Sequence, residues 1–170
     1  PAGESAGAPV TAPLAAAVIA ALRQQGQTLA AAESCTGGLV AKLLTDVPGA
    51  SGAFLGGVVS YTNGVKQGVL GVPEETLAAY GAVSPETARA MAQGVRRITG
   101  ADLGISVTGV AGPDRDDRGN EVGTVYAALS AAAGTFVRKL AVGCGSREEI
   151  RSRAAEEVLK MVLAQAAPAE

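Results

Sequence analysis

The stretch AAAESCTGGLVAKLL, residues 30–44, decides the interpretation of this chain. Its first residues are small and apolar and predict a buried strand, and Gly37 and Gly38 lead from Ser34 into a helical pattern. The N–H groups that open a helix lack partners within it and carry the positive end of its dipole, so they favour an anion or a developing oxyanion. The turn therefore suits a nucleophilic hydroxyl or a phosphate site, although a serine before a helix also serves as an ordinary N-cap.

The rest of the chain predicts an α/β protein around this turn. Of its 170 residues, 48% are hydrophobic but only 3% aromatic, so the core must be built from Ala, Val, Leu and Ile. Strands are expected at residues 28–32, 58–61, 103–108, 122–129 and 135–142. Helical patterns cover residues 10–25, 36–45, 65–70, 73–80 and 84–98, and a last helix starts at Ser146. Because the last two strands form a hairpin, we expect a three-layer α/β/α fold with a mixed sheet of about five strands.

The length predicts one domain, which we place at residues 10–166. Residues 1–9 are rich in Pro, Gly, Ala and Ser and are interpreted as a linker or the remnant of a longer chain, and residues 167–170 as a tail. An upstream domain would suit such a start.

Charge and composition exclude several function classes. The formal net charge of −2, with scattered Lys and Arg, provides no basic surface for direct nucleic-acid binding and no polybasic membrane anchor. The chain has no histidine, so histidine bases and HExxH zinc sites are excluded, and we expect no metal and no cofactor. Two cysteines indicate a reducing compartment, most simply the cytoplasm. The longest apolar run, residues 12–22, is too short to cross a bilayer.

A hydroxyl nucleophile without histidine needs another base. Lys66 follows the expected second strand, and a lysine kept neutral by burial can accept the proton of Ser34. Tyr61, five residues earlier, can face the same pocket and relay a proton or orient the base. A solvated surface lysine is the plainer alternative. Cys35 is a rival nucleophile, but neighbouring residues that leave a strand point in opposite directions, so we expect Cys35 to pack inward.

Two other segments are candidate ligand contacts. The loop Thr108-Gly109-Val110-Ala111-Gly112-Pro113 follows a strand and can bind phosphate, although it can also be a plain turn. Arg147, at the start of the last helix, can bind a phosphate through two parallel hydrogen bonds or remain an exposed charge of the first turn.

These segments together resemble a known family. The stretches AESCTGG, GGVVSYTNGVK, GAVSPETA, VTGVAGP, VGTVY and REEIR, in this order over residues 14–163, are similar to the CinA C-terminal domain family of nicotinamide-nucleotide amidohydrolases. The resemblance implies hydrolysis of nicotinamide mononucleotide, a pyridine nucleotide, to nicotinate mononucleotide and ammonia without a metal. It also implies an N-terminal molybdopterin-binding-like domain in longer members and, from the family's association with competence and DNA damage, a recombinase partner. Closed dimers are the commonest assembly, so we expect a homo-oligomer.

By matching position, the resemblance implies roles for nine residues. Ser34 would be the nucleophile, Lys66 the general base and Tyr61 the third member of a Ser-Lys-Tyr set. The expected substrate contacts are Thr36, Gly37, Gly38, Thr108, Gly109 and Arg147, with backbone N–H groups near residues 36–38 holding the oxyanion.

Two loops depart from the family pattern. After Pro113 the family continues through a glycine pair and later Lys-Pro, whereas this chain has Asp114-Arg115-Asp116 and then Asn120-Glu121; near the end, Phe-x-Gly-Asp-Arg is replaced by residues 143–147, GCGSR. Aspartates beside a phosphate would weaken its binding. The alternative function is therefore a nucleotide-sensing or partner-binding domain, linked to competence and DNA damage, with weak or no catalysis.

Overall fold

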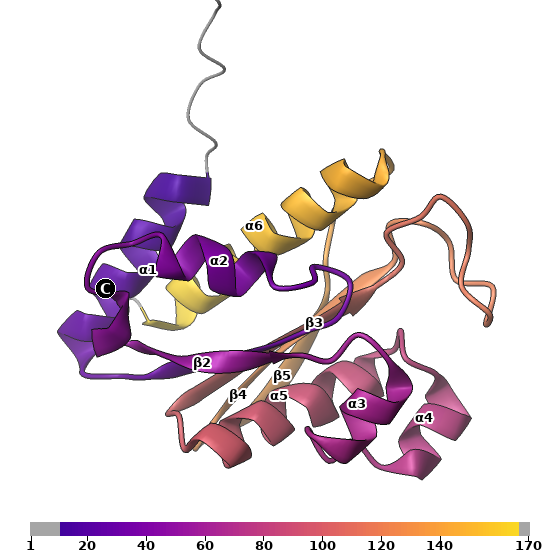
Figure 1. Ribbon diagram of the computed structural model, residues 1–170, viewed down its shortest axis with the longest axis horizontal. Coiled ribbons are helices and arrows are strands. Elements are labelled where there is room, and N and C mark those ends of the chain that lie inside the picture. Colours follow the sequence, from indigo (N-terminus) through magenta and orange to yellow (C-terminus); the bar gives the residue numbers. More distant parts are fainter. Residues whose placement is uncertain (1–10, 167–170) are drawn as a thin grey trace, which may run out of the picture.

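The computed structural model describes residues 11–166 of the chain (Figure 1). The linker expected at residues 1–9, residue 10 of the first helix and the tail at 167–170 lie outside the described residues. The helices are α1 (Thr11–Gln25), α2 (Leu39–Thr45), α3 (Asn63–Gly68), α4 (Glu74–Tyr80), α5 (Pro85–Thr99) and α6 (Arg147–Ala166), with a short 3₁₀ helix, η1, at Ala50–Gly52. The strands are β1 (Leu29–Glu33), β2 (Phe54–Val59), β3 (Leu103–Gly109), β4 (Val125–Ala131) and β5 (Gly134–Lys139).

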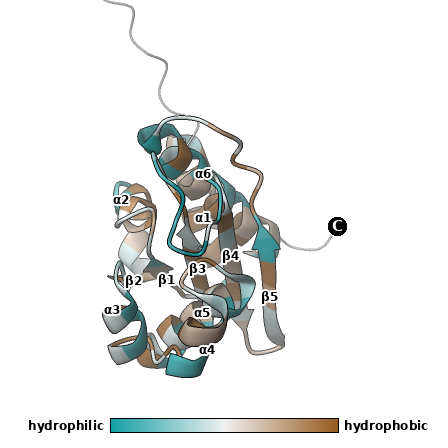
Figure 2. Ribbon diagram, turned by 90° about the vertical axis from the view of Figure 1, so that its right-hand side faces the viewer, coloured by the Kyte–Doolittle hydropathy of each residue, from teal (hydrophilic) through white to brown (hydrophobic). Residues whose placement is uncertain are grey.

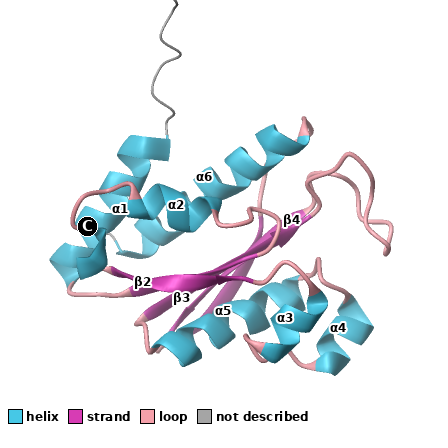
Figure 3. Ribbon diagram, in the orientation of Figure 1, coloured by secondary structure: helices cyan, strands magenta, loops and turns pink. Residues whose placement is uncertain are grey.

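The five strands form one mixed sheet in the order β2-β1-β3-β4-β5. The sheet lies between two layers of helices (Figure 3). Strand β1 pairs in parallel with β2 and β3, while β4 is antiparallel to both β3 and β5. The carboxyl ends of β1, β2 and β3 therefore lie at the same edge, which is where open α/β sheets bind ligands. The predicted mixed, five-stranded sheet is confirmed.

Helices cover both faces of the sheet. Helices α1, α2 and α6 lie on one side and α3, α4 and α5 on the other, as the perpendicular views of Figures 1 and 2 show. The larger apolar core lies under α1, α2 and α6 and includes Leu22, Leu29, Ile105 and Leu159. A smaller core around Leu70 and Met91 joins α5 to the other face. The three-layer α/β/α arrangement is therefore correct. No helix within residues 11–166 is both long enough and apolar enough to span a membrane.

Close backbone contacts explain one boundary that differs from the prediction. Strand β2 begins at Phe54, before the expected start at residue 58. A side chain at Gly57 would collide with the carbonyl oxygen of Ala31 on the paired strand β1. Gly57 thus permits close packing of β2 against β1. At its other end, β2 stops before Ser60, earlier than expected.

The helix after β1 begins later than predicted. Residues 36–38 form a turn in which Gly37 and Gly38 have φ values of +59° and +102°, and α2 itself starts at Leu39. Glycine adopts this left-handed conformation without the steric penalty of a Cβ atom. The turn carries the chain from the end of β1 past the candidate nucleophile into the helix.

Candidate functional site

The sheet edge that holds the carboxyl ends of β1, β2 and β3 contains a cavity of about 280 Å³. Ser34 follows β1, Tyr61 and Lys66 follow β2, and Thr108 and Gly109 end β3. Arg147 reaches the same cavity from the first turn of α6. The structure thus brings together six of the nine predicted residues, and the other lining residues are Cys35, Ala82, Val83 and Ala111.

Ser34 and Lys66 contact each other directly. The Nζ atom of Lys66 lies 2.7 Å from the Oγ atom of Ser34, within hydrogen-bonding distance. The same nitrogen donates to the main-chain carbonyl of Ser60 at 2.7 Å and approaches that of Tyr61 at 3.4 Å. Thr62 caps α3, the helix that carries Lys66, by accepting a hydrogen bond from the N–H of Val65. The lysine side chain is therefore held at the serine and is not a surface charge.

Burial changes the protonation of this lysine. Lys66 is only 1% exposed, and the loss of hydration lowers its pKa from 10.5 to about 8. The nearby Cys35 opposes this shift to a smaller extent. A neutral amine has one lone pair, and at this distance it can accept the proton of the Ser34 hydroxyl.

Cys35 is not a competitor for nucleophilic attack. Its side chain is 5% exposed and packs in the larger apolar core, as expected from its position beside Ser34. Burial raises the pKa of the Cys35 thiol to about 12. The thiolate, which is the reactive form, is therefore scarce at neutral pH.

Glu33 is a structural member of the site that sequence reasoning missed. Its buried carboxylate accepts hydrogen bonds from the hydroxyl of Thr36 at 2.6 Å and from the N–H groups of Val40 and Ala41 at 2.8 and 3.0 Å. It thereby satisfies N–H groups at the start of α2 and closes the turn around Ser34. The sequence does contain a signal for this role of Glu33: it is a carboxylate at the end of an apolar strand, directly before the candidate nucleophile.

Three predicted substrate contacts do not line the cavity. The Thr36 hydroxyl is fully buried and bonded to Glu33, so its side chain does not reach a ligand. Gly37 and Gly38 form the turn, and the N–H of Gly37 donates to the carbonyl of Ser34 at 3.1 Å. The turn therefore has no side chain for a ligand and can contact one only through backbone N–H groups that are not already bonded.

Tyr61 and Arg147 meet at the mouth of the cavity. Arg147 donates to the Tyr61 hydroxyl at 2.9 Å through one terminal nitrogen and to the carbonyl of Gly112 at 2.6 Å through the other. The tyrosine is 58% exposed, and its hydroxyl makes no hydrogen bond to Ser34 or Lys66 within the described structure. Tyr61 therefore contacts the base only through its main-chain carbonyl.

Thr108 and Gly109 form part of the cavity wall. The Thr108 hydroxyl donates to the carbonyl of Ala82 at 2.7 Å, which joins β3 to the segment before α5. Its proton is thus used within the protein, while its oxygen can still accept a hydrogen bond. A side chain at Gly109 would collide with Val125 on β4, so the strand pairing itself requires glycine there.

The altered loop after Pro113 is held away from the cavity. Asp116 accepts hydrogen bonds from the N–H groups of Arg118 and Asn120 and from the Asn120 side chain. Arg118 donates to main-chain carbonyls of α4 at residues 77–79. The loop aspartates do not line the cavity, so the repulsion of phosphate that they suggested has no direct geometric basis.

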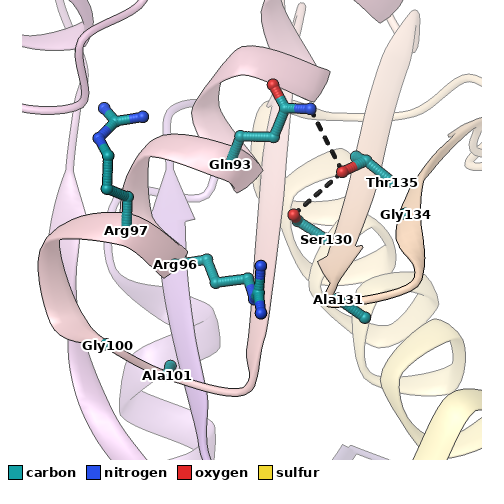
Figure 4. A pocket seen from close by; sticks show the side chains of 9 residues that line it. All are labelled: Gln93, Arg96, Arg97, Gly100, Ala101, Ser130, Ala131, Gly134 and Thr135. Carbon is teal, nitrogen blue, oxygen red and sulfur yellow. Dashed lines mark hydrogen bonds between the residues drawn. The ribbon is translucent and has the colours of Figure 1, made fainter.

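A larger cavity, of about 570 Å³, lies toward the opposite ends of the strands (Figure 4). It contains a hydrogen-bonded chain from Gln93 through Thr135 to Ser130, and two arginines from the last turn of α5. Arg96 and Arg97 donate to the carbonyls of Asp102 and Leu70, and cations at a helix carboxyl end are stabilised by its dipole. This cavity holds no activated nucleophile, so the smaller one is the candidate active site.

Comparisons with known proteins agree with the fold. The family profile of the CinA C-terminal domain matches residues 11–166. A CinA-like protein of Desulfotalea psychrophila is 51% identical over 142 residues, which cover 84% of this chain and 34% of the relative. A CinA-like protein of Geobacter sulfurreducens is 51% identical over 136 residues, covering 80% and 33%. The chain spans about a third of the length of the curated relatives it matches.

Solved structures are similar over nearly their whole length. The competence/damage inducible protein CihA from Agrobacterium tumefaciens has a TM-score of 0.86 at 38% identity, covering 91% of this chain and 94% of that one. A competence-damaged protein (CinA) superfamily protein from Klebsiella pneumoniae has a TM-score of 0.89 at 31% identity, covering 92% and 97%.

Proposed function

The chain belongs to the CinA C-terminal domain family, and from this premise and the site we propose that it hydrolyses the carboxamide of nicotinamide mononucleotide. The products would be nicotinate mononucleotide and ammonia. The single observation that carries the proposal is the 2.7 Å contact between the Nζ atom of Lys66 and the Oγ atom of Ser34, inside a cavity where burial lowers the lysine pKa. A neutral lysine can activate a serine hydroxyl in an amidase without histidine.

The reaction follows from these two groups. Ser34 attacks the carboxamide carbon while Lys66 takes the hydroxyl proton, and the carbonyl π electrons move to the oxygen. When the tetrahedral intermediate collapses, the C–N bond breaks and ammonia leaves with the proton from Lys66. Water then adds to the acyl-enzyme with Lys66 as base again, and the carboxylate product leaves as Ser34 regains its proton.

The charges around the cavity support an anionic substrate. Its lining contains the guanidinium of Arg147 and no carboxylate. Arg147 is exposed at the mouth, and exchanging its bond to Tyr61 for two bonds to a phosphate would retain its planar geometry. The carboxamide would then lie inward at Ser34, with the phosphate outward at Arg147.

The test is ammonia release from nicotinamide mononucleotide by the wild type, Ser34→Ala and Lys66→Ala. We expect turnover in the wild type and a loss of roughly a thousandfold or more in both variants, because the residues act as one unit. Ser51→Ala and Lys139→Ala, which alter an exposed serine and an exposed lysine, are controls for the same substitutions at the surface. Circular dichroism and thermal melting check that each variant is folded.

Two outcomes would contradict the proposal. Turnover that survives in a folded Ser34→Ala variant would remove the serine mechanism. Binding of nicotinamide mononucleotide without ammonia release in the wild type would instead favour the nucleotide-sensing function.

A further inference from the structure

The larger cavity, of about 570 Å³, has no role in the proposed reaction (Figure 4). It lies between the carboxyl end of α5 and the hairpin that joins β4 to β5, and it shares no lining residue with the active-site cavity. Its volume is within the range of about 300–1,000 Å³ that is typical of sites for small organic ligands. The residues that line it include two arginines and no carboxylate.

Arg96 has unused hydrogen-bond donors in this cavity. Its Nε atom donates to the carbonyl of Asp102 at 2.9 Å, but its two terminal nitrogens have no acceptor within residues 11–166 and form no ion pair there. The carboxylate of Asp102 is engaged elsewhere, because it accepts hydrogen bonds from the N–H and the hydroxyl of Thr28. Figure 4 shows the Arg96 side chain extending from α5 toward the strand that carries Ser130. The planar guanidinium is therefore free to bind an oxyanion through two N–H groups.

A hydroxyl proton is the second unused donor. Ser130 is 3% exposed, and its Oγ atom lies 3.0 Å from that of Thr135, which also accepts a hydrogen bond from Gln93. The bond between Ser130 and Thr135 uses one of their two hydroxyl protons, and the other has no acceptor in the part of the chain that the structure describes. Leaving a buried donor unpaired costs free energy, so an acceptor inside the cavity would be stabilised here.

The carboxyl end of α5 does not cancel the positive charge of the cavity. A helix carboxyl end disfavours anions through its exposed carbonyls. Here the carbonyl of Val95 accepts a hydrogen bond from the Thr99 hydroxyl, and that of Arg96 accepts one from the N–H of Gly100. Arg97 adds a second cation, although its side chain turns toward the carbonyl of Leu70. Two full positive charges thus oppose the partial negative charge of one helix end.

We propose that this cavity binds a small organic anion. A phosphate or carboxylate group would accept hydrogen bonds from the terminal nitrogens of Arg96 and from the free hydroxyl proton of the Ser130–Thr135 pair. The rest of the ligand would lie against Ala101 and Ala131, which line the same cavity. This site is independent of the Ser34 nucleophile and of the proposed amidase activity.

The experiment uses phenyl phosphate and benzoate, which carry the two oxyanions on the same ring, and benzyl alcohol as the neutral control. In ¹H–¹⁵N NMR titrations we expect at least one anion to shift the amides of Gly100, Ala101 and Gly134 saturably, with a Kd below about 1 mM, and benzyl alcohol to leave them unchanged. A response to phenyl phosphate alone would assign the site to phosphate esters, and a response to benzoate alone would assign it to carboxylates.

A charge-matched pair of variants separates the site from general attraction. Arg96→Gln should weaken binding about 10-fold or more, because it removes charge-assisted hydrogen bonds. Arg138→Gln removes the same charge from an exposed residue of β5 that does not line the cavity, and should change Kd less than about twofold. Equal losses in the two variants would overturn the inference.

A second pair tests the space itself and retains every charge. Ala131→Leu fills the cavity and should weaken binding at least as much as Arg96→Gln, whereas Ala132→Leu, at an exposed residue of the adjoining turn, should not. This pair decides the question if Arg96→Gln does not fold. Unchanged affinity in a folded Ala131→Leu variant would contradict the inference.

The inference and the proposed function fail separately. Ser34→Ala should retain the shifts at Gly100 and Ala101, whatever the outcome of the ammonia assay. Shifts confined to the amides of Gly109 and Arg147 would place the anion in the active-site cavity and overturn the inference, as would the absence of any saturable shift.

Discussion

Lys66 donates a 2.7 Å hydrogen bond to the main-chain carbonyl of Ser60, the same distance that separates its Nζ atom from Ser34. A neutral amine carries two protons and one lone pair, so a proton fixed on the Ser60 carbonyl leaves the lone pair free for the serine. The N–H of Ser60 in turn donates to the carbonyl of Glu33 at 2.7 Å, directly before the nucleophile. The orientation of the base is therefore tied to the strand that carries Ser34.

The first prediction concerns the pH dependence of catalysis. Only the neutral form of Lys66 accepts a proton, and its pKa is lowered to about 8. We expect kcat/KM to rise about tenfold per pH unit below pH 8 and to level off above it. Rates of ammonia release between pH 6 and 10 test this, and a profile that stays flat from pH 6 to 9 would rule out a lysine base.

The lowered pKa of Lys66 also predicts how the free energy of unfolding depends on pH. The pKa of Lys66 is lower in the folded protein than its ordinary value of 10.5, so the unfolded chain binds more protons between about pH 8 and 10.5. The contribution of Lys66 to the free energy of unfolding should rise over this range. Urea unfolding at pH 7.5, 9 and 10.5 measures it as the difference between wild type and Lys66→Met.

The second prediction concerns Glu33. In Glu33→Gln an NH₂ group replaces one carboxylate oxygen, so one of the two N–H groups of α2 that now bond to Glu33 loses its acceptor. Leaving that N–H group without an acceptor should reduce the free energy of unfolding by about 1–3 kcal/mol. Chemical denaturation tests this against Glu148→Gln, an exposed carboxylate in the first turn of α6. Equal, small losses in the two variants would show that the Glu33 cap contributes little.

The third prediction separates two roles for Tyr61. Its hydroxyl is bonded to Arg147 and not to Ser34 or Lys66. Because Arg147 would exchange this bond for a phosphate, Tyr61→Phe should lower KM and should change kcat by less than about threefold. Steady-state kinetics with nicotinamide mononucleotide give both constants. Tyr80→Phe, at a tyrosine of similar exposure, is the control. A large fall in kcat with unchanged KM would instead favour the Ser-Lys-Tyr set implied by the family resemblance.

The fourth prediction concerns the two cysteines. Burial raises the pKa of Cys35 to about 12, whereas Cys144 is exposed. Iodoacetamide at pH 7.5 should therefore label Cys144 in the folded protein and leave Cys35 unlabelled until urea is added. Mass spectrometry of tryptic peptides distinguishes the two sites. Rapid labelling of Cys35 in folded protein would restore it as a candidate nucleophile.

Local patterns were sufficient for much of the fold. Ser84 and Pro85 predict the start of α5, where the Ser84 hydroxyl accepts a hydrogen bond from Thr87, and Ser146 with Glu149 forms the expected capping box of α6. Such signals depend on neighbours along the chain and can therefore be found from sequence. The need for glycine at residue 57 could not be predicted from its neighbours along the chain, because the carbonyl oxygen that excludes a side chain there belongs to Ala31 on another strand.

By itself, the sequence limited the available chemistry: without histidine, the base had to be Lys, Asp, Glu or Tyr, and Ser34 and Lys66 followed expected strands. The tertiary structure alone decided that Lys66 is buried against Ser60, because desolvation depends on everything packed around the amine. It also decided which side chains bond to the turn after Ser34. Glu33, adjacent to the serine, bonds to Thr36, and Arg151, more than a hundred residues later, bonds to the carbonyl of Cys35. Propensity and spacing act over a few residues, whereas hydrogen-bond geometry and burial arise only when distant segments pack together.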